Sequence, residues 1–138
     1  MRVDAETIAR IDAGLLVLAG VASDDAPDDR EWIARKLADL RIFNDDRGVM
    51  NRSVIDVRGR VLAVSQFTLF ASTRKGSRPS WSRAAPPDIA APAFGEFVRV
   101  LEARLGARVA TGRFGANMHV ALVNDGPVTI WLDSRSRE

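Results

Sequence analysis

The chain has no cysteine and only one histidine, His119. The absence of cysteine excludes disulfides, thiolate nucleophiles and cysteine-ligated zinc. A histidine metal cluster or a Ser-His-Asp triad would depend on His119 alone. Because the strand expected around His119 offers it no catalytic partner, we interpret this histidine as non-catalytic.

Long hydrophobic runs are also missing. No apolar stretch approaches the roughly 20 residues that span a bilayer, and the N-terminus opens no signal-peptide segment. No glycine-rich phosphate fingerprint or P-loop occurs. At 138 residues, with 46% hydrophobic and 28% charged residues, the composition predicts one globular domain over 1–138. We expect it to be cytoplasmic, without membrane association.

Acidic residues are absent between Asp56 and Asp88, although the formal net charge of the whole chain is only +2. This interval carries six cations: Arg58, Arg60, Arg74, Lys75, Arg78 and Arg83. A local field of this kind attracts polyanions even when the whole molecule is nearly neutral.

The most informative stretch runs from Val61 to Trp81, VLAVSQFTLFASTRKGSRPSW. Val61–Val64 predicts a strand with no polar face, and Ser65-Gln66 then introduces hydroxyl and amide groups before the cations. Such a strand suits a site that receives an anion. A core strand followed by a solvated basic loop fits the same pattern, so composition alone leaves both interpretations open.

Hydrophobic periodicity predicts two helices among many short strands. We expect helices over about 28–39 and 88–104, the second ended by Gly106. The apolar run 15–21 predicts a central strand buried on both faces. Further strands are expected over 2–11, 41–43, 49–57, 108–113, 118–124 and 128–133, and a frayed tail over 134–138. The fold class is α/β, with mixed, mostly antiparallel, curved, barrel-like sheets and two helices packed outside.

Four ordered motifs carry a family resemblance: Ser65-Gln66-Phe67-Thr68-Leu69, Arg78-Pro79-Ser80-Trp81, Thr111-Gly112-Arg113-Phe114, and Asn124-Asp125-Gly126-Pro127-Val128-Thr129. In this order they resemble the D-aminoacyl-tRNA deacylase family, D-tyrosyl-tRNA(Tyr) deacylases included, over nearly the whole chain. The resemblance implies hydrolysis of the ester that joins a D-amino acid, and also glycine, to tRNA. It further implies a homodimer with each active site at the interface.

The resemblance also assigns the site residues. It places catalysis at Ser65, Gln66, Phe67 and Thr68. Because no ionisable base lies near Thr68 in the sequence, we assign Thr68 a positioning role, with attack assisted by backbone dipoles and the RNA itself. We therefore expect no metal and no cofactor.

Gly126-Pro127 would be the chirality-selecting loop, held cis and contributed by the partner subunit so that its carbonyls exclude L-amino acids. An ordinary Asp-Gly-Pro turn is the alternative. Substrate and tRNA contacts are expected from the phosphate-binding and base-binding side chains Arg74, Lys75, Arg78, Phe114 and Met118.

One departure from the family pattern concerns the N-terminus. Family members begin with an additional strand carrying a Gln-Arg pair, and that arginine supports the Gly-Pro loop. We expect this protein to lack that strand, unless the start of the sequence is placed too late. Two alternatives therefore accompany the enzyme hypothesis. One is a non-catalytic nucleic-acid-binding dimer, and the other is a relative with a trans Gly-Pro bond that accepts small L-amino acids.

Overall fold

The fold is built on a three-stranded parallel sheet in the order β3-β6-β7. The computed structural model describes residues 1–137. The sheet consists of β3 (Gly14–Ala19), β6 (Arg60–Ser65) and β7 (Ala110–Thr111). Two antiparallel pairs accompany it: β1 (Arg2–Val3) with β2 (Glu6–Thr7), and β4 (Phe43–Asn44) with β5 (Met50–Arg52). The predicted α/β class with mixed sheets and two helices is confirmed. Within the described residues no sheet closes into a barrel, so the barrel-like part of the prediction is not observed.

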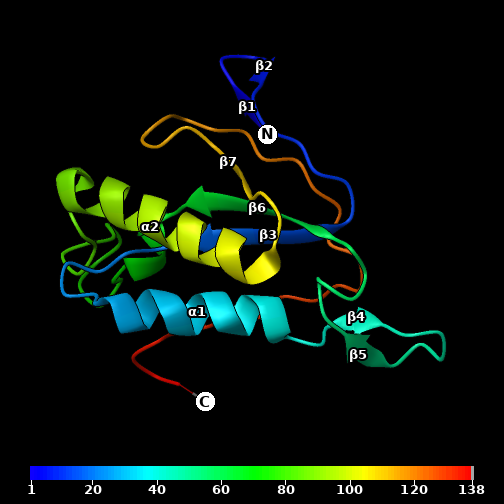
Figure 1. The fold of residues 1–138 in the computed structure, drawn as a ribbon. Coiled ribbons are helices and arrows are strands. Elements are labelled where there is room, and N and C mark those ends of the chain that lie inside the picture. The colour runs from blue at the N-terminus through cyan, green and yellow to red at the C-terminus, as the bar shows by residue number, and fades with distance from the viewer. Residues whose placement is uncertain (138) are drawn as a thin grey trace.

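Two helices connect the parallel strands: α1 (Pro27–Asp39) follows β3, and α2 (Pro87–Leu105) follows β6. Both match the predicted helices, and α2 ends at Gly106, whose φ of 68° is the left-handed conformation that glycine adopts readily. Figure 1 shows the amino ends of both helices at the same end of the molecule as the carboxyl ends of β3 and β6. That end is where an α/β sheet presents its site.

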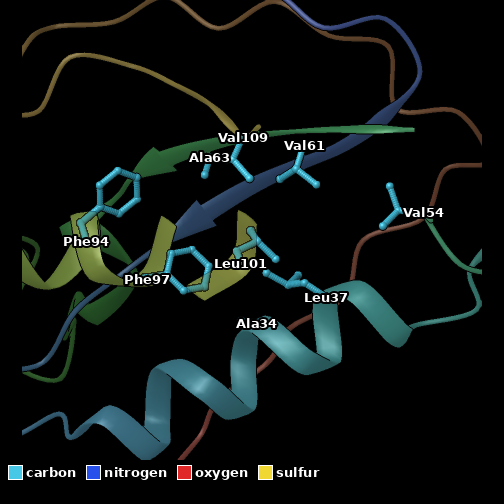
Figure 2. Close-up of a cluster of buried hydrophobic side chains, with 9 residues drawn as sticks. All are labelled: Ala34, Leu37, Val54, Val61, Ala63, Phe94, Phe97, Leu101 and Val109. Carbon is cyan, nitrogen blue, oxygen red and sulfur yellow. The ribbon is translucent and has the colours of Figure 1, made fainter. Parts of the chain in front are cut away.

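The hydrophobic core fills the space between the helices and the sheet (Figure 2). Phe94, Phe97 and Leu101 of α2 meet Val61 and Ala63 of β6 there. Leu62 and Val64, which alternate with them, are buried too. The predicted strand without a polar face is therefore confirmed, and this core fixes the position at which β6 ends.

The apolar run 15–21 does not form the central strand. β6 occupies the centre and β3 lies at the edge of the three-stranded sheet. Leu18 of β3 is accordingly 45% exposed. Hydrophobicity alone could not rank the two strands, because both runs are equally apolar and only the connections decide their order.

The strands expected over 118–124 and 128–133 are absent. Among the described residues, the backbone of this region has one bridge, between Arg2 and His119, at 2.8 Å in each direction. A strand needs a neighbouring backbone, and beyond that bridge this segment pairs with none among residues 1–137. Its side chains at Val123 and Trp131 are 90% and 67% exposed.

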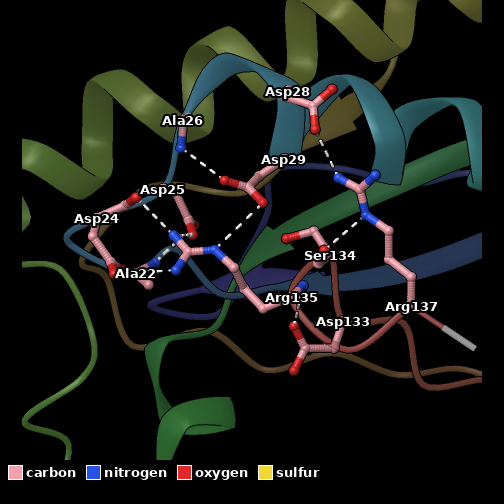
Figure 3. Close-up of polar contacts among 10 residues, drawn as sticks. All are labelled: Ala22, Asp24, Asp25, Ala26, Asp28, Asp29, Asp133, Ser134, Arg135 and Arg137. Atoms are coloured by element: carbon pink, nitrogen blue, oxygen red, sulfur yellow. Dashed lines mark hydrogen bonds and ion pairs between the residues drawn. The ribbon is translucent and has the colours of Figure 1, made fainter.

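Residues 134–137 of the tail expected to fray are instead docked, and Glu138 lies outside the described residues. Arg135 reaches three carboxylates at the start of α1, those of Asp24, Asp25 and Asp29, at 3.1–3.5 Å (Figure 3). Arg137 pairs with Asp28 at 2.8 Å and stacks on an aromatic ring of α1, that of Trp32. The composition of the tail gave no sign of this, because its partners lie more than 100 residues earlier in the chain.

Candidate active site

The residues Ser65 and Gln66 lie where β6 leaves the sheet. Ser65 is the last residue of β6 and is in register with Ala19, the last residue of β3. The Gln66 N–H donates to the carbonyl of Ala19 at 2.8 Å, which extends the parallel pairing by one residue. Both side chains are half-buried. The core beneath β6 thus delivers a hydroxyl and an amide group to the open end of the sheet.

A 3₁₀-helix, η1 (Phe67–Phe70), follows immediately, so the strand does not continue through the whole motif. The Leu69 N–H donates to the Gln66 carbonyl at 3.3 Å, and the Ala71 N–H donates to the Thr68 carbonyl at 3.0 Å. The Gln66 side-chain amide donates to the hydroxyl of Thr68. The turn therefore brings Ser65, Gln66 and Thr68 together and orients two of their side chains on each other.

No ionisable side chain takes part in this cluster. Within residues 1–137, no acidic, basic or histidine side chain is hydrogen-bonded to Ser65, Gln66 or Thr68. The same part of the chain holds no group of three acidic or histidine side chains placed to bind a metal ion. What the cluster offers a substrate is neutral: hydroxyls, an amide and backbone N–H groups.

Gly20 forms the floor of this cluster, which the sequence motifs did not indicate. A Cβ at position 20 would lie 2.8 Å from Cε2 of Phe70 and 3.2 Å from the carbonyl oxygen of Gln66. Both distances are shorter than ordinary contacts, so only glycine allows the turn to approach β3 this closely. A glycine directly after an apolar strand was the available signal.

The cations Arg74, Lys75 and Arg78 lie on a hairpin that starts just beyond η1. Ser72 and Ser80 close it with two backbone hydrogen bonds of 2.7 and 2.9 Å. We call residues 72–80 the basic hairpin. All its side chains are exposed, and its cations make no ion pair with any described residue. The hairpin that carries the predicted tRNA-binding cations therefore begins two residues after η1, the turn that follows the end of β6.

The Gly126-Pro127 loop is held by Asn124. The Asn124 side chain accepts from the Val128 N–H at 3.1 Å and donates to the Thr129 hydroxyl at 3.0 Å. The Gly126-Pro127 peptide bond is cis, and Gly126 has a φ of 135°. Among the described residues no hydrogen bond joins this loop to residues 65–70. Hydrogen bonds within the described chain thus do not bring the loop and the cluster together.

The two predicted pocket residues lie beyond β7. Met118 lines a cavity of about 520 Å³, together with the first two residues of the chain and residues 119–121. Its sulfur would collide with a Cβ at position 112, so Met118 packs directly onto Gly112. Phe114 is 39% exposed. His119, at the rim of the same cavity, is occupied through its backbone in the bridge to Arg2.

The pKa values of the carboxylates at the start of α1 shift in opposite directions. Hydrogen bonding from Arg135 lowers the pKa of Asp24, and the Ala26 N–H does the same for the pKa of Asp29. Burial raises the pKa of Asp25, because its charged form loses water. The hydrogen bond to Asp24, together with the charges of Asp24, Asp29 and Asp25, raises the pKa of Arg135. These shifts belong to the docked tail and not to the cluster at the end of β6.

Known proteins match the chain over almost its whole length. Residues 1–133 match the family model described as D-Tyr-tRNA(Tyr) deacylase. A D-aminoacyl-tRNA deacylase of Chromobacterium violaceum is 60% identical over 99% of this chain and 91% of that protein, and one of Opitutus terrae is 57% identical over the same shares.

Solved structures agree with these matches. A c-Myc DNA Unwinding Element Binding Protein superposes with a TM-score of 0.88 at 37% identity, covering 96% of this chain and 89% of its own. A probable eukaryotic D-amino acid tRNA deacylase has the same fold, with a TM-score of 0.69 at 17% identity over 83% of this chain and 81% of its own. The chain therefore belongs to the D-Tyr-tRNA(Tyr) deacylase family, which confirms the resemblance that its four motifs indicated.

Proposed function

We propose that this protein hydrolyses the ester between a D-amino acid and the terminal ribose of tRNA, releasing the free D-amino acid and the tRNA. The observation that carries the proposal is the neutral cluster of Ser65, Gln66 and Thr68 at the open end of the sheet, in a chain that belongs to a deacylase family. Water supplies the hydroxyl group to the acyl carbon, and the ribose oxygen leaves with a proton.

Stabilisation of the developing oxyanion is the role we assign to the cluster. The N–H groups of Phe67 and Thr68 donate to no carbonyl within the described chain, so they are available to the ester oxygen. Donors fixed before reaction stabilise the transition state without reorganising. Since no general base is in contact with the cluster, positioning and the neighbouring ribose hydroxyl of the substrate supply the rest.

The second subunit completes the site in this proposal. Four large apolar side chains on either side of the Gly126-Pro127 loop are exposed: Leu122, Val123, Ile130 and Trp131. Within the described residues, the backbone of 120–132 forms no bridge to another segment of the chain. An apolar, unpaired segment is a ready surface for a second copy of the chain. The protein then forms a homodimer in which each Gly126-Pro127 loop enters the partner's site.

The oligomeric state is directly testable. The change Val123→Asp places a carboxylate at the most exposed apolar position of this segment, and we expect it to convert a dimer into a monomer in analytical ultracentrifugation. Asp125→Asn, in the same loop, is the matched control and should stay dimeric. A wild-type protein that sediments as a monomer at micromolar concentration would contradict the shared site.

Chirality is selected, in this proposal, by the main chain of the loop. Gly126 and Pro127 present carbonyl groups rather than side chains, so a side chain of L configuration would collide with fixed backbone. Glycine has no such side chain, and we therefore expect glycyl-tRNA to be a substrate as well.

The basic hairpin binds the phosphates of the acceptor end in this proposal. We place the reaction in the cytoplasm, where tRNA is charged. Within the described residues no helix has the length and hydrophobicity to span a membrane.

The test is release of amino acid from D-tyrosyl-tRNA and L-tyrosyl-tRNA. We expect rapid hydrolysis of the D-ester and little of the L-ester, and Gln66→Ala should slow the D-reaction by about ten- to a hundredfold, the cost of lost transition-state positioning. Equal rates of tyrosine release from the D-ester and the L-ester would contradict chiral selection and indicate an esterase without selectivity. No release of either would favour the alternative suggested by the basic hairpin, a nucleic-acid-binding protein without catalysis.

A further inference from the structure

Two exposed aromatic rings stand at the base of the basic hairpin. Trp81 follows Ser80, the residue that closes the hairpin, and Phe67 opens η1 on its other side. Their ring centroids are 5.5 Å apart with an interplanar angle of 73°, an edge-to-face contact. Phe67 is nevertheless 53% exposed and Trp81 38% exposed. Each ring supports the other while both remain accessible.

The stretch of chain that carries the two rings has charges of one sign only. The three cations of the basic hairpin lie on the loop that leads into Trp81, and the Arg83 guanidinium lies 5.9 Å from the centroid of the Phe70 ring. The sequence has no carboxylate between Asp56 and Asp88. Aromatic faces beside a cationic loop are the combination that binds single-stranded nucleic acid, because bases stack on the rings while cations contact the phosphates.

We infer that Trp81 is a binding residue for the substrate, on which a base of the single-stranded 3′ end of tRNA stacks. Phe67 holds the indole through the edge-to-face contact, and the Ser72–Ser80 hydrogen bonds fix the chain just before it. This inference rests on the proposed function and adds to it a base-stacking contact next to the cluster that would receive the ester. Stacking on one face tolerates different bases, so the contact positions the end of the RNA without reading its sequence.

The experiment compares two RNA ligands against three proteins. Uncharged tRNA and the same tRNA lacking its single-stranded 3′ nucleotides are titrated against the wild type, Trp81→Leu and Trp81→Phe. We expect Trp81→Leu to weaken binding of intact tRNA by about tenfold, the loss of one aromatic stacking partner. Binding of the truncated tRNA should be unchanged, which also shows that the variant is folded. Trp81→Phe, which retains an aromatic face, should bind intact tRNA within about twofold of the wild type.

Two results would overturn the inference: equal weakening for both RNAs, or no weakening for either. The first would place Trp81 in the general fold or in phosphate binding, and the second would remove it from the RNA surface. Because the titration uses uncharged tRNA, it is independent of hydrolysis. A wild type that releases no D-tyrosine but shows the expected pattern would overturn the proposed enzyme and leave the stacking contact standing.

Discussion

A methyl group at position 20, beneath the cluster of Ser65, Gln66 and Thr68, should disturb the cluster. In Gly20→Ala the new Cβ would lie 2.8 Å from Cε2 of Phe70 and 3.2 Å from the Gln66 carbonyl oxygen. Ordinary carbon contacts are about 3.5–4.0 Å, so the ring edge must move by roughly 0.7 Å or more. Phe70 belongs to η1, and its movement displaces the turn that orients Gln66 and Thr68.

Gly20→Ala should lower both the free energy of unfolding and kcat, by amounts that follow from these distances. Overpacking of this kind costs about 1–3 kcal/mol, and reduced freedom of the unfolded chain returns about 0.4–1 kcal/mol of it. The net loss in the free energy of unfolding should be about 1 kcal/mol. Hydrolysis should fall far more, by about ten- to a hundredfold in kcat, since a displacement approaching 1 Å in a positioned site has that effect.

The assay pairs urea denaturation with the rate of D-tyrosine release from D-tyrosyl-tRNA. Gly95→Ala is the matched control: it lies within α2, and a Cβ there meets nothing within 4 Å. The control should gain about 0.5–1 kcal/mol of stability, as Gly→Ala does in a helix, with unchanged kcat. If Gly20→Ala is destabilised as expected but retains full kcat, the geometry of η1 has no part in the reaction.

Three further changes have definite expected outcomes. Gly126→Ala should reduce D-ester hydrolysis by at least about tenfold, because φ of 135° is unfavourable for alanine and a Cβ would lie 2.8 Å from the Val128 side chain; near-normal activity would remove the loop from the site. Arg135→Gln should lower thermal stability at pH 7 more than the control Arg104→Gln, which loses one ion pair of 3.5 Å. Since the depressed pKa values of Asp24 and Asp29 contribute stability only while these groups are ionised, the deficit of Arg135→Gln should shrink as the pH falls below about 4, and a constant deficit would contradict this origin. Neutralising the three cations of the basic hairpin together should weaken tRNA binding and reduce its salt dependence by about three units of slope, whereas an unchanged slope would place the RNA elsewhere.

Both helices and β6 could be predicted from the sequence, because the spacing of their apolar side chains is a local feature of the chain. Periodicity located both helices, and the unbroken apolar run 61–64 located β6. The motifs indicated the polar groups at the end of that strand. These features depend on local spacing and burial, which a sequence records directly.

Features that depend on long-range partners were not predictable. Residues 118–133 have the composition of strands, but within the described chain only His119 among them pairs with another segment. The docking of Arg135 depends on carboxylates about 110 residues away. The order of β3 and β6 in the sheet depends on connections, which the apolar runs do not encode. Gly20 was missed because its role comes from a contact with η1 and not from any motif.

The sharing of each active site between two subunits is the central claim, and subunit mixing tests it most directly. Gln66→Ala and Gly126→Ala, each expected to be at least about tenfold slower than the wild type on its own, are mixed in equal amounts, unfolded together and refolded. If each site combines the cluster of one subunit with the loop of its partner, half of the dimers are mixed and each regains one intact site. D-tyrosyl-tRNA hydrolysis should then recover to about a quarter of the wild-type rate. A mixture that stays as slow as its two components would show that cluster and loop do not act across an interface.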